Sequence, residues 1–173
     1  YLADIITGQV NRLRAASGPD DPVKISEAWS PDGTLVLYQG AGTRTEIVMM
    51  TAAGIPLGRT TEFAFPRYGM RAAWSPDGQR VAIGGAEGQC PYGPLVLNNQ
   101  FEVIARGNPP PSMCEPVWSP DGSYLAFMGV RASAAGSADG RVDIYVGNSN
   151  GQGAANLTSN LRGTIELLGW VGG

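Results

Sequence analysis

Two cysteines are the side chains in this sequence with the clearest capacity for chemistry. Cys90 and Cys114 can join in a disulfide, or they can remain as two unrelated free thiols. A disulfide would imply an oxidising compartment. The spacing of the two residues alone does not choose between these states, so the choice depends on the elements that carry them.

The residue types give little support to catalytic chemistry. The chain of 173 residues contains no histidine, which excludes Ser-His-Asp and Cys-His nucleophilic arrangements and the imidazole ligands of most zinc sites. Neither a phosphate-binding glycine loop nor a dinucleotide-binding fingerprint is present. We therefore expect no catalytic residue, no metal site and no cofactor, and a protein that is not an enzyme.

Three aspartates raise the question of a calcium site: Asp32, Asp77 and Asp121. Each lies in a separate copy of a repeated motif and lacks the clustered oxygen donors that calcium requires. Aspartate is also a preferred turn residue, because its side chain can bond the backbone of a turn. We therefore interpret all three as turn residues.

These aspartates belong to a pentapeptide, Trp-Ser-Pro-Asp-Gly, that occurs at residues 29–33, 74–78 and 118–122, about every 45 residues. Serine can cap a turn, proline fixes φ at its second position and glycine accepts a positive φ, so the motif predicts a tight turn between two strands. The tryptophan at a fixed place before each turn is expected to pack between repeated units. A degenerate fourth copy, without the turn residues, is centred on Trp170.

Strand-like patterns surround each turn. A short strand that ends in the tryptophan precedes each turn, and an apolar strand and two further strands follow it. The strands after the turns cover residues 35–38, 46–50, 58–61, 81–83, 94–97, 103–106, 124–127, 142–146 and 155–158. Four antiparallel strands in about 45 residues is the size of a β-propeller blade. The 25 glycines and 13 prolines also favour many short strands over long helices.

These motifs resemble those of the TolB-like, WD-repeat-related propellers, whose blades carry the Trp-Ser-Pro-Asp-Gly turn. The expected fold class is therefore all-β: a β-propeller of four-stranded antiparallel blades, with about four blades or as an arc of a larger propeller. Residues 1–173 are expected to form a single propeller domain. Its expected parts are a partial blade at 1–14, blades at 25–61, 70–106 and 114–159, and a closing strand within 163–173.

Two ways of completing the propeller remain open. A strand at residues 164–168 could join the N-terminal strand pair within one chain and so remove exposed sheet edges. Alternatively, the chain is an arc of a larger propeller, six-bladed as the TolB resemblance suggests. Its sides would then be covered by further residues or by another copy, which makes a homodimer an option.

Blade topology favours pairing of the cysteines. Cys90 lies in the loop between the second and third strands of one expected blade, and Cys114 precedes the first strand of the next. Because strands alternate in direction, both loops emerge on the same face of the propeller. We predict a disulfide that braces residues 107–111, with two free thiols as the alternative.

The loops on the cysteine-bearing face are the expected interaction site. Propellers recognise partners through loops that project from a rigid scaffold. Tyrosine and arginine suit recognition because they combine contact area with hydrogen-bonding tips. The candidate partner-binding residues are Arg67, Tyr68, Tyr92 and Arg131.

The leading functional hypothesis is a non-enzymatic scaffold that binds a protein or peptide through this face. The alternatives are the accessory propeller of a larger enzyme, such as a prolyl-oligopeptidase-type peptidase, and the sensor domain of a membrane receptor kinase. A hydrolase domain or a transmembrane span in the parent protein would distinguish them.

The net charge of −3 argues against a nucleic acid partner. No apolar stretch approaches the roughly 18 residues that membrane insertion needs. The resemblance and the predicted disulfide indicate a periplasmic, secreted or cell-surface location.

Overall fold

The computed structural model describes residues 2–3, 6–11, 27–40, 46–60, 70–85, 90, 95–106, 112–132 and 138–171. The regular secondary structure of these residues is β-strand, and none of them lies in a helix. The all-β fold class is therefore confirmed. No helix that could cross a membrane occurs in the described part of the chain.

The strands follow one another along the chain, first as a pair and then in groups of four. The first pair and the first group are β1 (Leu2–Ala3), β2 (Val10–Asn11), β3 (Glu27–Trp29), β4 (Leu35–Gly40), β5 (Glu46–Thr51) and β6 (Pro56–Thr60). The second group is β7 (Met70–Trp74), β8 (Arg80–Gly85), β9 (Leu95–Asn98) and β10 (Val103–Arg106). The third group is β11 (Cys114–Trp118), β12 (Tyr124–Ala132), β13 (Ala138–Asn148) and β14 (Ala155–Asn156).

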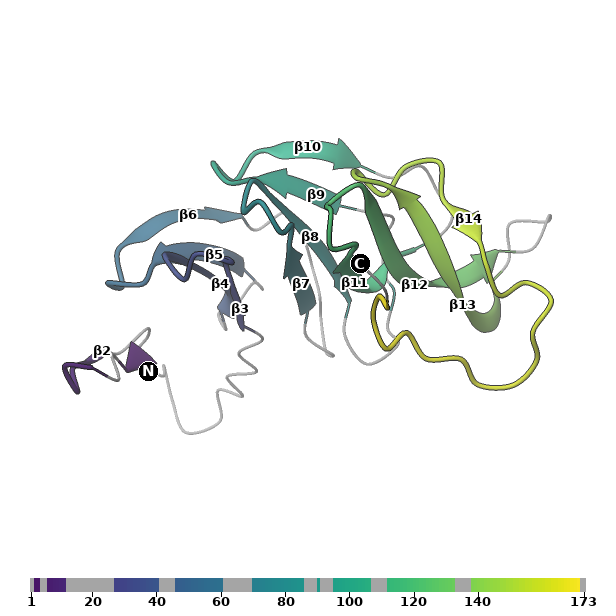
Figure 1. Ribbon diagram of the computed structural model, residues 1–173, viewed down its shortest axis with the longest axis horizontal. Coiled ribbons are helices and arrows are strands. Elements are labelled where there is room, and N and C mark those ends of the chain that lie inside the picture. The colour runs from purple at the N-terminus through teal and green to yellow at the C-terminus, as the bar shows by residue number, and fades with distance from the viewer. Residues whose placement is uncertain are drawn as a thin grey trace.

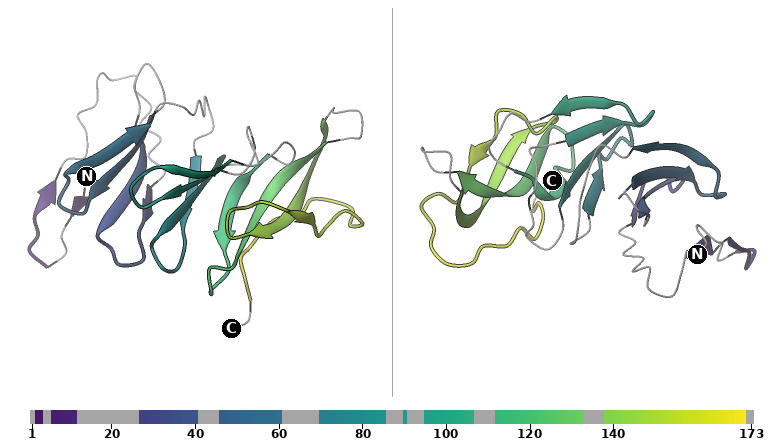
Figure 2. Two further views of the ribbon diagram at one scale, coloured as in Figure 1. Left: turned by 90° about the horizontal axis from the view of Figure 1, so that it is seen from above. Right: turned by 180° about the vertical axis from the view of Figure 1, so that it is seen from behind.

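Each group of four is an antiparallel meander in chain order. The strands β1 and β2 form a separate two-stranded sheet. Figures 1 and 2 show the sheets standing side by side along an arc, with β1 and β2 at one end and the β11–β14 group at the other. This arrangement is a partial β-propeller of four-stranded antiparallel sheets, whereas the exact blade limits given above stay predictions.

The second and third groups are joined by hydrogen bonds into one continuous sheet, which the sequence did not predict. The joint is a single parallel pairing of Cys114 with Gly85, where the Gly85 N–H donates to the carbonyl oxygen of Met113 at 3.1 Å. The approach depends on Gly84, because a Cβ at that position would lie 3.0 Å from the Met113 oxygen. A side chain at position 84 would crowd the backbone of Met113 and Cys114, and glycine avoids this crowding.

The core lies between the sheets. Strand alternation sends successive side chains to opposite faces, so the second group packs one face on the first group and the other on the third. The core between the first and second groups contains Leu37, Ile47, Met49, Trp74, Val81, Ile83, Leu95 and Leu97. The core between the second and third contains Ala82, Val96, Ala105, Met113, Trp118, Leu125, Phe127 and Tyr145.

The C-terminal part of the chain differs from the expectation of a closing strand. Residues 164–168 form no strand in the structure, and among the described residues β1 pairs only with β2. The side chain of Trp170 explains the difference, because its indole N–H donates to the carbonyl oxygen of Val117 at 3.0 Å. This bond holds the segment beside β11, whereas β1 and β2 lie at the opposite end of the arc (Figure 1).

Candidate functional site

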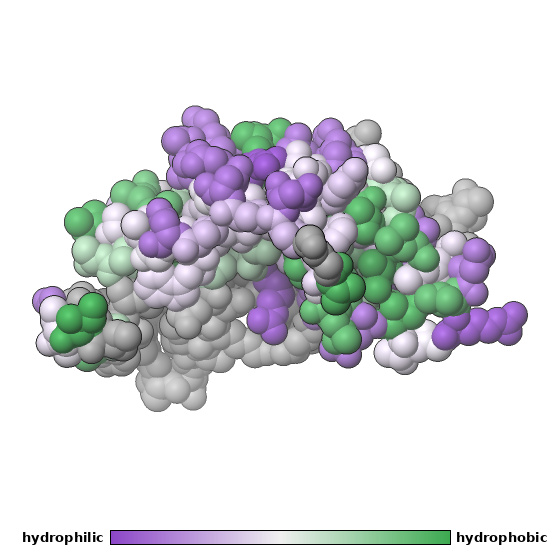
Figure 3. Space-filling model, viewed as in Figure 1, coloured by the Kyte–Doolittle hydropathy of each residue, from purple (hydrophilic) through white to green (hydrophobic). Residues whose placement is uncertain are grey.

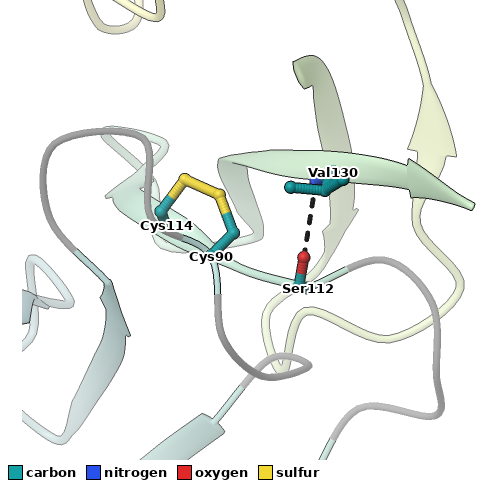
Figure 4. Close-up of a disulfide and its surroundings, with 4 residues drawn as sticks. All are labelled: Cys90, Ser112, Cys114 and Val130. Carbon is teal, nitrogen blue, oxygen red and sulfur yellow. Dashed lines mark hydrogen bonds between the residues drawn. A yellow bond between two sulfur atoms is a disulfide. The ribbon is translucent and has the colours of Figure 1, made fainter. Parts of the chain in front are cut away.

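The predicted disulfide is confirmed. The sulfurs of Cys90 and Cys114 are 2.06 Å apart and their Cα atoms 4.7 Å apart (Figure 4). Cys114 begins β11 and is fully buried, whereas Cys90 is half-buried in the connection that follows β8. The bridge therefore fastens the connection after β8 to the start of the next group of strands.

The backbone next to the disulfide is fixed from a third strand as well. The Ser112 hydroxyl accepts a hydrogen bond from the N–H of Val130 in β12, at 3.4 Å (Figure 4). Glu115 has a φ of +50°, an unusual value for a residue with a side chain, and the register of β11 on β12 shifts between Cys114 and Val117. The ends of β8, β11 and β12 thus meet at the disulfide.

The structure tests little of the predicted partner-binding set. Arg67, Tyr68 and Tyr92 lie outside the described residues. The backbone of Arg131 is in β12, next to the residue that bonds Ser112, but its side chain is outside the description. These four residues therefore stay predictions for the disulfide-bearing face.

The sequence analysis missed the contact of Gly85 with Met113, although two glycines in a row at the end of an aliphatic strand were a signal of close backbone approach.

The Trp-Ser-Pro-Asp-Gly turns lie at the opposite end of the strands, and they are built alike. In the second turn, the buried Ser75 hydroxyl donates to Asp77 at 2.5 Å and accepts from the N–H of Arg80 at 2.9 Å. The final glycine of each turn has a φ between +68° and +70°. The turn prediction is therefore correct for every copy.

Each aspartate of these turns accepts hydrogen bonds from residues of its own turn. The hydrogen bond from Ser119, followed by that from the N–H of Ser123, lowers the pKa of Asp121 to about 2. The corresponding serine bonds are also the largest cause of the lowered pKa values of Asp32 and Asp77. In the described part of the chain, no three His, Cys, Asp or Glu side chains form a group that could hold a metal ion.

The tryptophans link neighbouring groups of strands through one repeated hydrogen bond, which we call the tryptophan latch. The indole N–H donates to the carbonyl oxygen of the residue just before the preceding tryptophan of the series. The bonds run from Trp74 to Ala28 at 3.1 Å, from Trp118 to Ala73 at 2.9 Å and from Trp170 to Val117 at 3.0 Å. Trp170 therefore occupies the same place as the tryptophans of the complete motifs.

One carboxylate, that of Asp143 in β13, is completely buried. It accepts hydrogen bonds from Arg141 at 3.0 Å, from Thr158 at 2.9 Å and from the Asn156 amide at 2.8 Å. Burial raises its pKa, but the bonds from Asn156 and Thr158 and the charge of Arg141 outweigh this effect, so the pKa lies below its ordinary value. The group is fully engaged in attaching β14 to β13, and its arrangement is structural.

The described residues form a partial β-propeller. Two solved structures are similar to it: TolB from Acinetobacter baumannii, and a protein assigned as TolB from Agrobacterium tumefaciens. The first is 19% identical with a TM-score of 0.56 over 90% of this chain and 36% of its own. The second is 19% identical with a TM-score of 0.55 over 78% of this chain and 49% of its own.

These likenesses confirm the resemblance to TolB-like propellers at the level of the fold. The chain spans about a third to a half of the length of the two structures that it matches. No protein-family model matches the sequence, and no curated protein matches it.

Proposed function

We propose that this chain is a non-enzymatic scaffold that binds a protein or peptide through the disulfide-bearing face. The observation that carries the proposal is the junction of β8, β11 and β12 at the Cys90–Cys114 bridge. A junction of this kind holds the bases of the adjoining loops in fixed positions. Fixed loop bases reduce the entropy that is lost when loops bind a partner.

Two features support a binding role over catalysis. The sequence offers no histidine for acid–base or nucleophilic catalysis. The carboxylate of Asp143, which is fully buried, is already occupied by three hydrogen-bond donors. The similarity to TolB structures adds a fold in which partner recognition is the expected use, and the disulfide supports a periplasmic, secreted or cell-surface location.

A site-specific photo-crosslinker tests the proposal. The crosslinking residue replaces Tyr92 on the proposed face and, in a control, Gln79 in the turn at the opposite end of the strands. Each protein is irradiated with envelope and secreted proteins of the source organism, and the adducts are identified by mass spectrometry. We expect a defined adduct from position 92 that position 79 does not give; equal adducts from both positions would contradict the proposal.

The identified partner is then purified and titrated. The double variant R67A/Y68A should weaken binding by about tenfold or more, because a few tyrosine and arginine side chains usually carry most of the binding energy. The matched control is R71A, an exposed arginine in β7. Unchanged affinity of the double variant, or an equal loss in the control, would remove these residues from the site.

A further inference from the structure

The turns between the third and fourth strands of the three groups are built alike. They occupy residues 51–55 in the first group, 98–102 in the second and 148–152 in the third. In each turn the N–H of the first residue donates to the carbonyl oxygen of the fifth, and the N–H of the fourth donates to the carbonyl oxygen of the first, at 2.7–3.0 Å. The three turns can therefore be compared position by position.

The fourth position of these turns has a positive φ, and in one turn it holds a phenylalanine. Gly54 and Gly151 stand there with φ of +86° and +71°, whereas Phe101 has a φ of +70°. The left-handed region costs a residue with a Cβ free energy, and a bulky residue is seldom found in it. The turn alone favours glycine at this position, so the reason for the phenylalanine lies outside the turn.

The ring of Phe101 lies against the first group of strands. A Cβ at Gly58 of β6 would lie 3.2 Å from Cδ1 of Phe101, so the ring is in close contact with the backbone of β6. Phe101 is half-buried and packs against the core between the first and second groups. Figure 1 shows the turn between β9 and β10 beside β6. The glycine at position 58 thus leaves room for a ring that comes from the second group.

The other side chains of this turn are polar and bond within the second group. The Asn98 Oδ1 accepts hydrogen bonds from the N–H of Gln100 at 3.1 Å and from that of Glu102 at 2.8 Å. Figure 3 shows hydrophilic side chains gathered over the turn. Asn98 therefore stabilises the turn from within, whereas Phe101 reaches the neighbouring group.

We propose that Phe101 is a strained clasp that holds the first group of strands on the second, and that withdrawal of its ring from Gly58 is a step in the separation of the two groups. The clasp lies beside the fourth strand β6, whereas the Trp74 latch to Ala28 joins the first strands β7 and β3. The two contacts thus hold the first group at both edges of its sheet. Contact with β6 compensates for the strain in the turn.

Two variants of the full chain separate the strain from the ring contact. F101A loses the ring and keeps the strain, whereas F101G loses both, because glycine adopts a positive φ without cost. In urea unfolding, F101A should raise the unfolding equilibrium constant about tenfold or more over the wild type, and that of F101G should be about fivefold smaller than that of F101A. Equal constants for the two variants, or an F101G protein as stable as the wild type, would overturn the proposal.

A variant of the contacted glycine tests the contact itself. G58V places a branched side chain where the ring lies and should raise the unfolding constant about tenfold in the wild type. In the F101G background it should change that constant less than about twofold, since no ring remains to be displaced. L57V, at the exposed neighbouring residue of β6, is the control and should have little effect in either background. Equal effects of G58V in the two backgrounds would overturn the contact.

Hydrogen exchange tests whether the clasp joins the two groups. If opening of the first group breaks the contact, the amides of β5 and β6 should exchange about tenfold faster in F101A than in the wild type. L57V should exchange there as the wild type does. Unchanged exchange of β5 and β6 in F101A, together with a raised global unfolding constant, would show that the first group opens with the ring still in place and would overturn the proposal.

Discussion

The indole N–H of Trp118 donates a hydrogen bond of 2.9 Å to the carbonyl oxygen of Ala73, a residue of the preceding group of strands. The ring of Trp118 is buried, and the guanidinium of Arg80 lies 4.9 Å from its centroid. One side chain therefore connects two groups of strands by a hydrogen bond, by apolar contact and by a cation–π interaction.

W118F keeps most of the apolar ring but removes the donor. We expect it to lower the free energy of unfolding by about 1 kcal/mol, because the Ala73 carbonyl loses its partner, and W118A to lower it by about 3–5 kcal/mol. The measurement is urea unfolding followed by circular dichroism. Trp29 is 40% exposed, so W29F is the control and should change stability by less than about 0.5 kcal/mol. An equal effect of the two phenylalanine variants would refute the role given to the latch.

The serine of each turn should contribute measurably to the free energy of unfolding, although its side chain is small. S75A removes the acceptor for the N–H of Arg80 and the donor to Asp77, both at a buried position. We expect a loss of about 1–2 kcal/mol in the free energy of unfolding, from the same urea titration. Q100A, at an exposed residue in another turn, should have no measurable effect. A stable S75A protein would show that the backbone alone determines this turn.

Low pH should lower the stability of the fold, because it protonates the aspartates of the turns. Because the pKa of Asp121 is lowered from 3.8 to about 2 in the folded protein, the ionised form stabilises the fold above pH 4. This contribution is lost as the pH falls from about 4 to about 2. Urea midpoints of wild type and D121N, measured at pH 5, 4, 3 and 2, should differ most at pH 5 and converge at pH 2. Parallel curves over the whole range would contradict the assignment.

Reduction of the disulfide should destabilise the protein without abolishing its strands. The bridge joins residues that are 24 positions apart, and a loop of this size corresponds to about 3.5 kcal/mol in the chain-entropy account. Urea unfolding with and without reductant measures the change, and C90S/C114S should reproduce it. Mass spectrometry after alkylation provides the control: the unreduced protein should take up no alkyl group and the reduced protein two. Alkylation before reduction would contradict the bridge.

The turns and most strands of this fold could be predicted from the sequence, because the residue types of the turn motif favour the conformation that they adopt. Ser75 and Gly78 take the hydroxyl bonds and the positive φ that their types favour, and the strands on either side follow from apolar patterns. The Cys90–Cys114 bridge could also be predicted, since it depends only on which ends of antiparallel strands lie on one face.

The differences arise from contacts between distant residues. The strand predicted at 164–168 had the right pattern, but a strand also needs a neighbour, and Trp170 holds this segment beside Val117 instead. The joint between Gly85 and Met113 likewise depends on how closely two groups of strands approach, and the glycine pair signals a close approach without saying which segment approaches. The roles of Arg67, Tyr68 and Tyr92 depend on a partner and stay predictions.

The joint at Gly85 has a consequence for how the molecule opens. Gly85 of β8 is hydrogen-bonded to Met113, just before β11, and the disulfide ties the connection after β8 to Cys114 of β11, so the second and third groups cannot separate freely. Among the described residues, the first group contacts the second through packed side chains and the Trp74 latch. Native-state hydrogen exchange should therefore find residues 70–85, 95–106, 112–132 and 138–156 opening as one cooperative unit, with β3–β6 exchanging independently and earlier.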